Sequence, residues 1–282
     1  MSLLALSPGT EEAAAHGHAP ATVPEYVAHH IMDANEWEVF GYTFHLPHWH
    51  VQIGNMMIDL SITKHVLMMM IVSVALILIS AILFRKQKLV WTGFASVLES
   101  LVLFIRDEIA IPNMGEEDGR KFTPFLSTIF LFILILNLLG LIPIFATSTG
   151  NLSVTAGFAL IVLGIIFYMG MKKNGILGFF KSLIPHGVPV LISVILFPIE
   201  IISIVSKIFA LTVRLFANMI AGHFALFYII GIIVMVGLPF VAASVPLALF
   251  IDLLEVLVAF IQAYIFTILA ALFIGMYMHP EH

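Results

Sequence analysis

The sequence contains no cysteine, which excludes disulfide bonds and thiolate metal sites. It is also poor in charge: only 10% of its 282 residues are Asp, Glu, Lys or Arg, against about 25% in an average soluble domain. Hydrophobic residues make up 61% of the chain, and many of them form runs long enough to cross a bilayer. This composition excludes an ordinary soluble domain and predicts a polytopic membrane protein.

Residues 1–63 lack Lys and Arg altogether, although they contain several acidic residues. Because positive charge accumulates on the cytoplasmic flanks of membrane spans, we expect this segment outside the cytoplasm. Its first residues also lack the basic region and the apolar length of a signal peptide. Histidines occur there in close pairs, at 16 and 18, 29 and 30, and 48 and 50. These spacings match no zinc pattern, so we expect solvated or interface histidines and no metal site.

The first crossing is predicted at residues 65–84, a run of 20 residues without a charge. The sequence RKQK follows directly and is typical of a cytoplasmic flank, so the N-terminus is expected outside. In residues 89–109, charged side chains are interspersed with Leu, Val and Phe at helical spacing, which predicts an amphipathic helix on the cytoplasmic surface. Residues 112–121, PNMGEEDGRK, are predicted to form a polar loop on the same side.

A hairpin of two crossings is predicted at residues 122–145 and 152–171, joined by the short turn ATSTGN. Lys172 and Lys173 at its end agree with a return to the cytoplasm. Residues 176–188 are expected to form a short cytoplasmic or interfacial link.

Two much longer apolar runs follow, at residues 190–236 and 240–278. Each would be on the order of 60 Å long as one helix, about twice what a bilayer requires. Such helices must either break, at Pro198 and Pro246, or lie steeply tilted. Residues 64–282 are therefore predicted to form an all-α polytopic membrane domain whose C-terminus is cytoplasmic. Its parts are an upright N-terminal helix, an amphipathic surface helix, a transmembrane hairpin and a long tilted C-terminal helical hairpin.

The first long run is apolar but carries five polar side chains, and Glu200, Lys207, Arg214 and Asn218 fall in line as one stripe, with His223 beyond them. Arg214 cannot lose its proton at biological pH, and it lies roughly 24 Å along a helix from Pro198. A charge so far from water is a candidate functional site. Arg214 and Asn218 share a helix face, whereas His223 is expected on roughly the opposite side, facing a different neighbour.

The second long run supplies three polar candidates, Asp252, Glu255 and Gln262. If the two arms are antiparallel and turn near Pro239, residues at equal distances from the turn should meet. This counting pairs His223 with Glu255 and Arg214 with Gln262. A histidine–carboxylate pair can titrate near neutrality, as a proton relay requires.

Other interpretations are open on these residues alone. Buried polar groups in membrane helices can simply satisfy one another, and for Asn137 and Asn218 this is as good an interpretation as a functional one. A self-contained channel or transporter would be expected to show internal repeats, and the sequence has no strong one. An intramembrane enzyme would need a nucleophile arrangement or an HExxH motif, and none is present.

Four stretches resemble the subunit a family of F-type ATP synthases: LTVRLFANMIAGH, LVAFIQAYIFTIL, NLLGLIP and PEYVAHHI. The resemblance covers nearly the whole chain in the right order, and the motif with Arg214 is highly specific. It implies a proton-conducting stator subunit that provides two offset half-channels and couples proton flow to rotation and ATP synthesis or hydrolysis. The subunit itself would not be an enzyme and would need no cofactor.

The resemblance also implies roles for individual residues. Arg214 matches the essential arginine that faces the rotating ring of c subunits. Asn218 and Gln262 match polar residues beside it, His223 and Glu255 match a pair in the entry half-channel, and Glu200 matches an acidic residue of the exit half-channel. Asp252 and Lys207 are further candidates. In some members the acidic residue and the histidine occupy each other's positions, and an aspartate stands where this chain has Gly140.

The implied surroundings are those of a bacterial inner membrane. The expected partners are the c-ring, b-type peripheral stalk subunits and the lipid bilayer, with no nucleic acid. The expected transported ion is H⁺ rather than Na⁺.

Overall fold

A computed structural model describes residues 36–39, 42–45, 50–53, 56–59, 61, 63–83, 85, 92–142, 145, 147–183, 189–236 and 241–278. The predicted turn at Pro239 and most of the paired histidines lie outside these residues. Two small antiparallel sheets precede the helices. β1 (Glu36–Val39) pairs with β2 (Tyr42–His45), and β3 (His50–Ile53) pairs with β4 (Met56–Asp59).

The regular structure described after these strands is helical. Its elements are α2 (Lys64–Leu83), α3 (Phe94–Phe104), the π-helical η1 (Ile105–Ala110), α4 (Ile111–Met114), α5 (Glu116–Gly140), the 3₁₀ turn η2 (Ser148–Gly150), α6 (Leu152–Asn174), α7 (Ile176–Ser182), α8 (Val190–Val236) and α9 (Val241–Met278). Within the described residues, five helices are long and apolar enough to cross a membrane, namely α2, α5, α6, α8 and α9. The predicted fold class, an all-α polytopic membrane protein, is confirmed.

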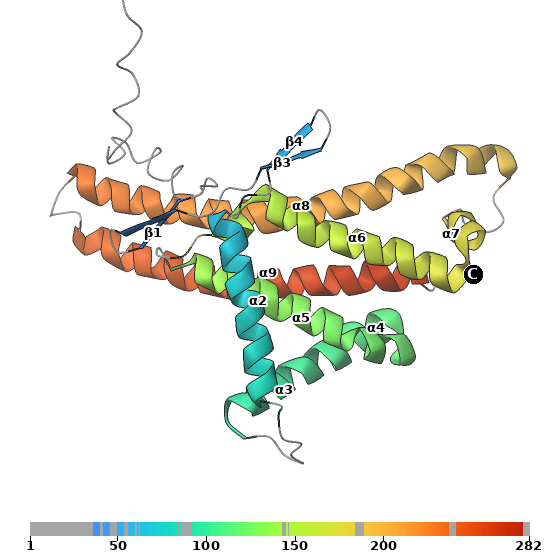
Figure 1. Cartoon of the computed structure of the whole chain (residues 1–282), viewed down its shortest axis with the longest axis horizontal. Coiled ribbons are helices and arrows are strands. Elements are labelled where there is room, and N and C mark those ends of the chain that lie inside the picture. Colours follow the sequence, from blue (N-terminus) through green and yellow to red (C-terminus); the bar gives the residue numbers. More distant parts are fainter. Residues whose placement is uncertain are drawn as a thin grey trace, which may run out of the picture.

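The two long helices are continuous rather than broken. α8 has 47 residues and α9 has 38, and both continue through their internal prolines, Pro198 and Pro246. At 1.5 Å per residue, α8 is about 70 Å long, more than twice the thickness of a hydrocarbon core. Figure 1 shows α8 and α9 running antiparallel across the view, while α2 stands upright across them.

The surface helix and the start of α5 differ from prediction. The helix that begins at Phe94 continues through η1 and α4 to Met114, and α5 begins at Glu116, so most of the predicted polar loop is helical. Acidic residues in the first turn of a helix favour its dipole, and salt bridges at i,i+4 support it. Here Glu116 pairs with Arg120 at 3.0 Å and Glu117 pairs with Lys121 at 2.7 Å. Gly115, with φ 80°, is the single residue between α4 and α5.

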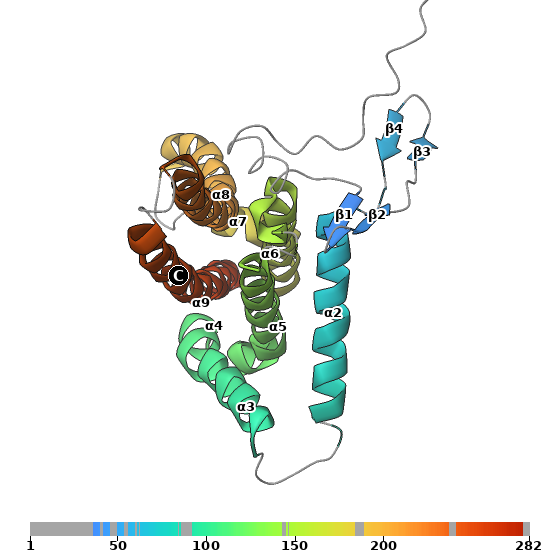
Figure 2. The same ribbon diagram turned by 90° about the vertical axis from the view of Figure 1, so that its left-hand side faces the viewer.

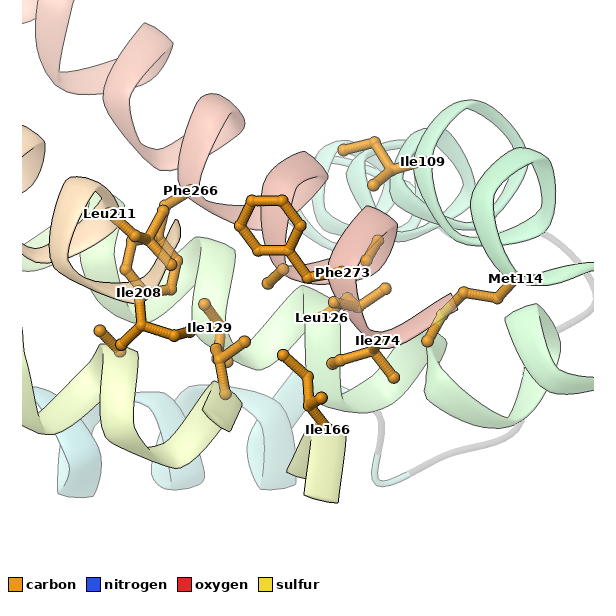
Figure 3. Close-up of a cluster of buried hydrophobic side chains, with 14 of the residues drawn as sticks. Ile109, Met114, Leu126, Ile129, Ile166, Ile208, Leu211, Phe266, Phe273 and Ile274 are labelled. Atoms are coloured by element: carbon orange, nitrogen blue, oxygen red, sulfur yellow. The ribbon is translucent and has the colours of Figure 1, made fainter. Parts of the chain in front are cut away.

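The apolar core surrounds the C-terminal half of α9. Figure 3 shows side chains of η1, α5, α6, α8 and α9 meeting there, among them Ile109, Leu126, Ile166, Ile208 and Phe273. Gly275 of α9 lets the backbone of α4 approach closely, because a Cβ at this position would meet the carbonyl oxygen of Asn113. The surface helix is thereby packed directly against the end of the long hairpin.

The first transmembrane helix is the least buried. Its buried side chains all lie near its N-terminal end, at Lys64, His65, Met68 and Val72. Figure 2 shows α2 beside α5 and α6, with α3 below and to one side. The exposed remainder is apolar, with Ile77 and Ile82 among the most exposed residues. A lipid environment suits this surface, since lipid tails are as apolar as the side chains they would cover.

Candidate functional site

Arg214 lies near the middle of α8 and is exposed on the surface of the chain. It forms no ion pair and no hydrogen bond with any of the described residues. Asn218 and Gly222 follow at steps of four residues, so the three positions form one ridge of the helix. The ridge is exposed at Arg214 and partly buried at Asn218 and Gly222. The structure therefore presents a permanent positive charge with no counter-charge among the described residues.

Glu255 of α9 packs against the buried end of this ridge. A Cβ on Gly222 would lie 2.5 Å from Glu255 Oε1 and 2.8 Å from its Cδ, so only glycine leaves room for the carboxyl group. A cavity of about 140 Å³ adjoins it, lined by Glu255, Asn137 and Asn218 among mostly apolar residues. Glu255 Oε1 and Asn137 Oδ1 are buried without a hydrogen-bond partner among the described residues. Buried polar atoms need partners, and a cavity of this size and lining can hold water.

His223 is buried and faces away from the ridge, toward the end of α5. Its Nδ1 lies 3.0 Å from the carbonyl oxygen of Met219, one turn back along α8. Its Nε2 lies 2.9 Å from the carbonyl oxygen of Gly140 and 2.8 Å from the hydroxyl of Thr147. When Nε2 carries a proton, it can donate to the Gly140 carbonyl; when it does not, it can accept from the Thr147 hydroxyl. The surroundings thus accommodate both protonation states of the imidazole.

Counting from Pro239 predicted that His223 meets Glu255 and that Arg214 meets Gln262, and neither pair forms a hydrogen bond in the described part of the structure. Glu255 meets Gly222, and the ring of His223 bonds to α5, to the loop that follows it and to its own helix. Consecutive residues of a helix point about 100° apart, so an error of one position aims the side chain elsewhere. Arg214 is exposed, whereas Gln262 is 4% exposed and its Nε2 has no partner among the described residues. The expectation that His223 and Arg214 face different neighbours agrees with the structure.

A second polar cluster lies near the opposite end of the hairpin. Tyr277, close to the end of α9, donates its hydroxyl to Glu200 Oε1 at 2.9 Å. Lys207 Nζ lies 3.2 Å from the Tyr277 hydroxyl and 4.0 Å from Glu200 Oε1. The sequence interpretation placed Glu200 and Lys207 on one stripe, and the structure brings them together through a residue that the interpretation missed.

Three residues of these sites were not identified from the sequence. Tyr277 and Thr147 lie 77 and 76 positions from their partners Glu200 and His223, and no short-range pattern links them. Gly222 did carry a signal, since it stands one turn beyond Asn218 on the arginine face. Asp252 is exposed, one turn from Glu255. Among the described residues, no group of three or more His, Cys, Asp or Glu is arranged to hold a metal ion.

Comparisons with known proteins show which family the chain belongs to. The family model described as ATP synthase A chain matches residues 66–275. A relative from Myxococcus xanthus, named ATP synthase subunit a, is 45% identical over 267 residues, which cover 86% of this chain and 87% of the relative. A protein of the same name from Chlorobium phaeobacteroides is 42% identical, over 94% of this chain and 79% of the relative. Another from Anaeromyxobacter dehalogenans is 49% identical, over 77% of this chain and 58% of the relative. The chain therefore belongs to the ATP synthase A chain family.

Proposed function

We propose that this chain carries protons past a rotating c-ring, with Arg214 facing the ring between two offset half-channels. The observation that carries the proposal is the exposed guanidinium of Arg214, in the middle of a long apolar helix and without a counter-charge among the described residues. Such a charge is costly in a membrane unless another molecule supplies its partner. A carboxylate on the ring fits that need. Exposed apolar side chains elsewhere on α8 and α9, among them Val205, Phe209 and Leu253, suit contact with lipid or a membrane-embedded partner.

The entry half-channel is proposed to run past His223 and Glu255 toward Asn218 and Arg214. Glu255, the adjoining cavity and Asn218 are contiguous, and they lead along the same ridge to the arginine. Gln262 and Asp252 lie on the same helix as Glu255 and are proposed to serve this path. His223 and Thr147 lie on the other side of α8 from the ridge, beside the end of α5, where they are proposed to transfer protons toward Glu255.

The exit half-channel is proposed to pass Glu200 and Lys207 at the other end of α8. Glu200 lies 14 residues before Arg214, about 21 Å along the helix, so the two paths are offset with the arginine between them. A proton reaching the ring neutralises its carboxylate, which can then move through lipid. When that site returns to Arg214, the nearby positive charge favours ionisation and release of the proton.

The orientation and the partners are part of the same proposal. Lys172 and Lys173 at the end of α6 favour a cytoplasmic location for this end of the hairpin. The N-terminus is then outside and the C-terminus cytoplasmic, in a bacterial inner membrane. The chain would conduct H⁺ without catalysing a reaction itself, and would assemble with the c-ring and b-type stalk subunits.

The proposal is tested by replacing Arg214 with lysine in the complete complex. An ammonium can lose its proton on burial and lacks the planar set of five donors, so Arg214→Lys should assemble normally but lose most ATP-driven proton pumping. Arg120→Lys is the matched control, because Arg120 forms an exposed salt bridge with Glu116. Native pumping by Arg214→Lys in reconstituted vesicles would contradict the proposed role.

A further inference from the structure

We propose that Tyr277 is a positioning residue that holds Glu200 and Lys207 in one hydrogen-bonded chain and so controls proton transfer at this end of the hairpin. The inference rests on the proposed role of Glu200 in the exit half-channel. It adds a residue from α9 to a path otherwise built on α8.

The direction of the hydrogen bonds follows from the chemistry of the three groups. An ammonium can only donate, an ionised carboxylate can only accept, and a tyrosine hydroxyl does both. Lys207 Nζ is 3.2 Å from the Tyr277 hydroxyl, and this hydroxyl is 2.9 Å from Glu200 Oε1. Lys207 therefore donates to Tyr277, and Tyr277 donates to Glu200. A donor aimed at a carboxylate stabilises its charged form.

Tyr277 is itself held firmly by other elements. Its carbonyl oxygen accepts a hydrogen bond from Asn174 Nδ2 at 3.3 Å, at the end of α6. Its ring packs edge-on against Phe179 of α7, with 6.4 Å between the centroids, and the residue is only 6% exposed. Lys207 Nζ also lies over the rings of Tyr277 and Phe273, at 5.4 and 5.8 Å from their centroids, within the range of cation–π attraction. These contacts fix the position of the Tyr277 side chain, and therefore of its hydroxyl group.

The cluster connects the protein interior with its surroundings. The side chains of Glu200 and Lys207 are 31% and 28% exposed, whereas Tyr277 is buried behind them. Other charged groups of the described elements at this end are Lys172 and Lys173 on α6, Lys181 on α7, and the first turns of α5, where Asp118 pairs with Lys173 and Glu116 and Glu117 pair with Arg120 and Lys121. Tyr277 is therefore the neutral donor on α9 whose hydrogen bond fixes the position of the Glu200 carboxylate.

The test compares Tyr277→Phe with Tyr264→Phe in the complete ATP synthase complex, reconstituted in vesicles. Both changes remove one hydroxyl from α9 and keep the ring. Tyr264 is exposed and contacts Phe104 through its ring, so its variant is the control. ATP-driven proton pumping is measured while the pH is varied separately on each side of the membrane.

We expect Tyr277→Phe to slow pumping about tenfold, the size expected for one hydrogen bond to a charged group. Its pH profile should change on the Glu200 side only, because the hydroxyl that is lost donates to the Glu200 carboxylate. In a Glu200→Gln background, Tyr277→Phe should cause no further change. An unchanged profile, or an equal change on both sides, would overturn the inference. Normal pumping by Arg214→Lys would instead refute the proposed function itself.

Discussion

Replacing Gly222 with alanine should displace the Glu255 carboxyl group without unfolding the helix. The added Cβ would lie 2.5 Å from Oε1, 2.8 Å from Cδ and 3.2 Å from Cγ of Glu255. Ordinary contacts between non-bonded carbon atoms are about 3.5–4.0 Å, so the carboxyl group must retreat by about 1 Å. The atoms that must move belong to a flexible side chain. Alanine also favours a helix over glycine by about 1 kcal/mol, so assembly should survive.

The effect on transport should be much larger than the effect on stability. A displacement of about 1 Å at a reacting group can cost about 100-fold in rate, so we expect Gly222→Ala to reduce ATP-driven proton pumping by roughly 10- to 100-fold. Gly164→Ala in α6 is the matched control, because a Cβ there would meet nothing within 4 Å. Subunit content of the purified complex, measured alongside, separates lost transfer from lost assembly.

A compensating change tests the geometry itself. Aspartate is one methylene shorter than glutamate, so Glu255→Asp should restore room for the methyl group in Gly222→Ala. The double variant should therefore pump faster than Gly222→Ala alone, which is the positive coupling expected of residues in contact. Pumping at the native rate by Gly222→Ala, or no gain from Glu255→Asp, would refute the packing of Glu255 against Gly222 as a requirement for transfer.

Two further predictions concern the packing of α4 and the surroundings of His223. Gly275→Ala would force a Cβ against the backbone carbonyl of Asn113, which cannot move aside as a side chain can. We therefore expect the complex to lose about 1–3 kcal/mol of stability and to unfold at a lower temperature than the Gly164→Ala control. An unchanged unfolding temperature would contradict this prediction. When His223 Nε2 carries no proton, the Thr147 hydroxyl can donate to it, whereas the Gly140 carbonyl can only accept. Thr147→Val should therefore leave this form without that donor and reduce pumping about tenfold, since a buried unsatisfied group costs about 1–3 kcal/mol. Thr147→Ser should retain activity, and equal rates for the valine variant and the native chain would count against this role.

The helices could be predicted from the sequence because each crossing is a long run of apolar residues. The lengths of the last two runs predicted helices that either break or tilt, and α8 and α9 are continuous at Pro198 and Pro246. The start of α5 was missed because its first turn is as charged as a loop. Its helical form depends on local pairs such as Glu116 with Arg120, which hydropathy does not detect.

The site was predictable in its residue types but not in its contacts. Glu200, Lys207, Arg214 and Asn218 stand out because charge and amide groups are rare in an apolar helix. Their partners depend on how the helices are rotated against one another, and counting from a turn does not give that rotation. A single position separates Gly222, which meets Glu255, from His223, which meets Gly140.

The most direct test of the central claim is ATP-driven acidification of vesicles containing the complete complex with Arg214→Ala. The account predicts that pumping disappears while the subunit still assembles, because the exposed charge of Arg214 forms no ion pair or hydrogen bond within the described chain. Pumping that survives at the native rate would contradict the account, and Arg214 would then be a structural residue.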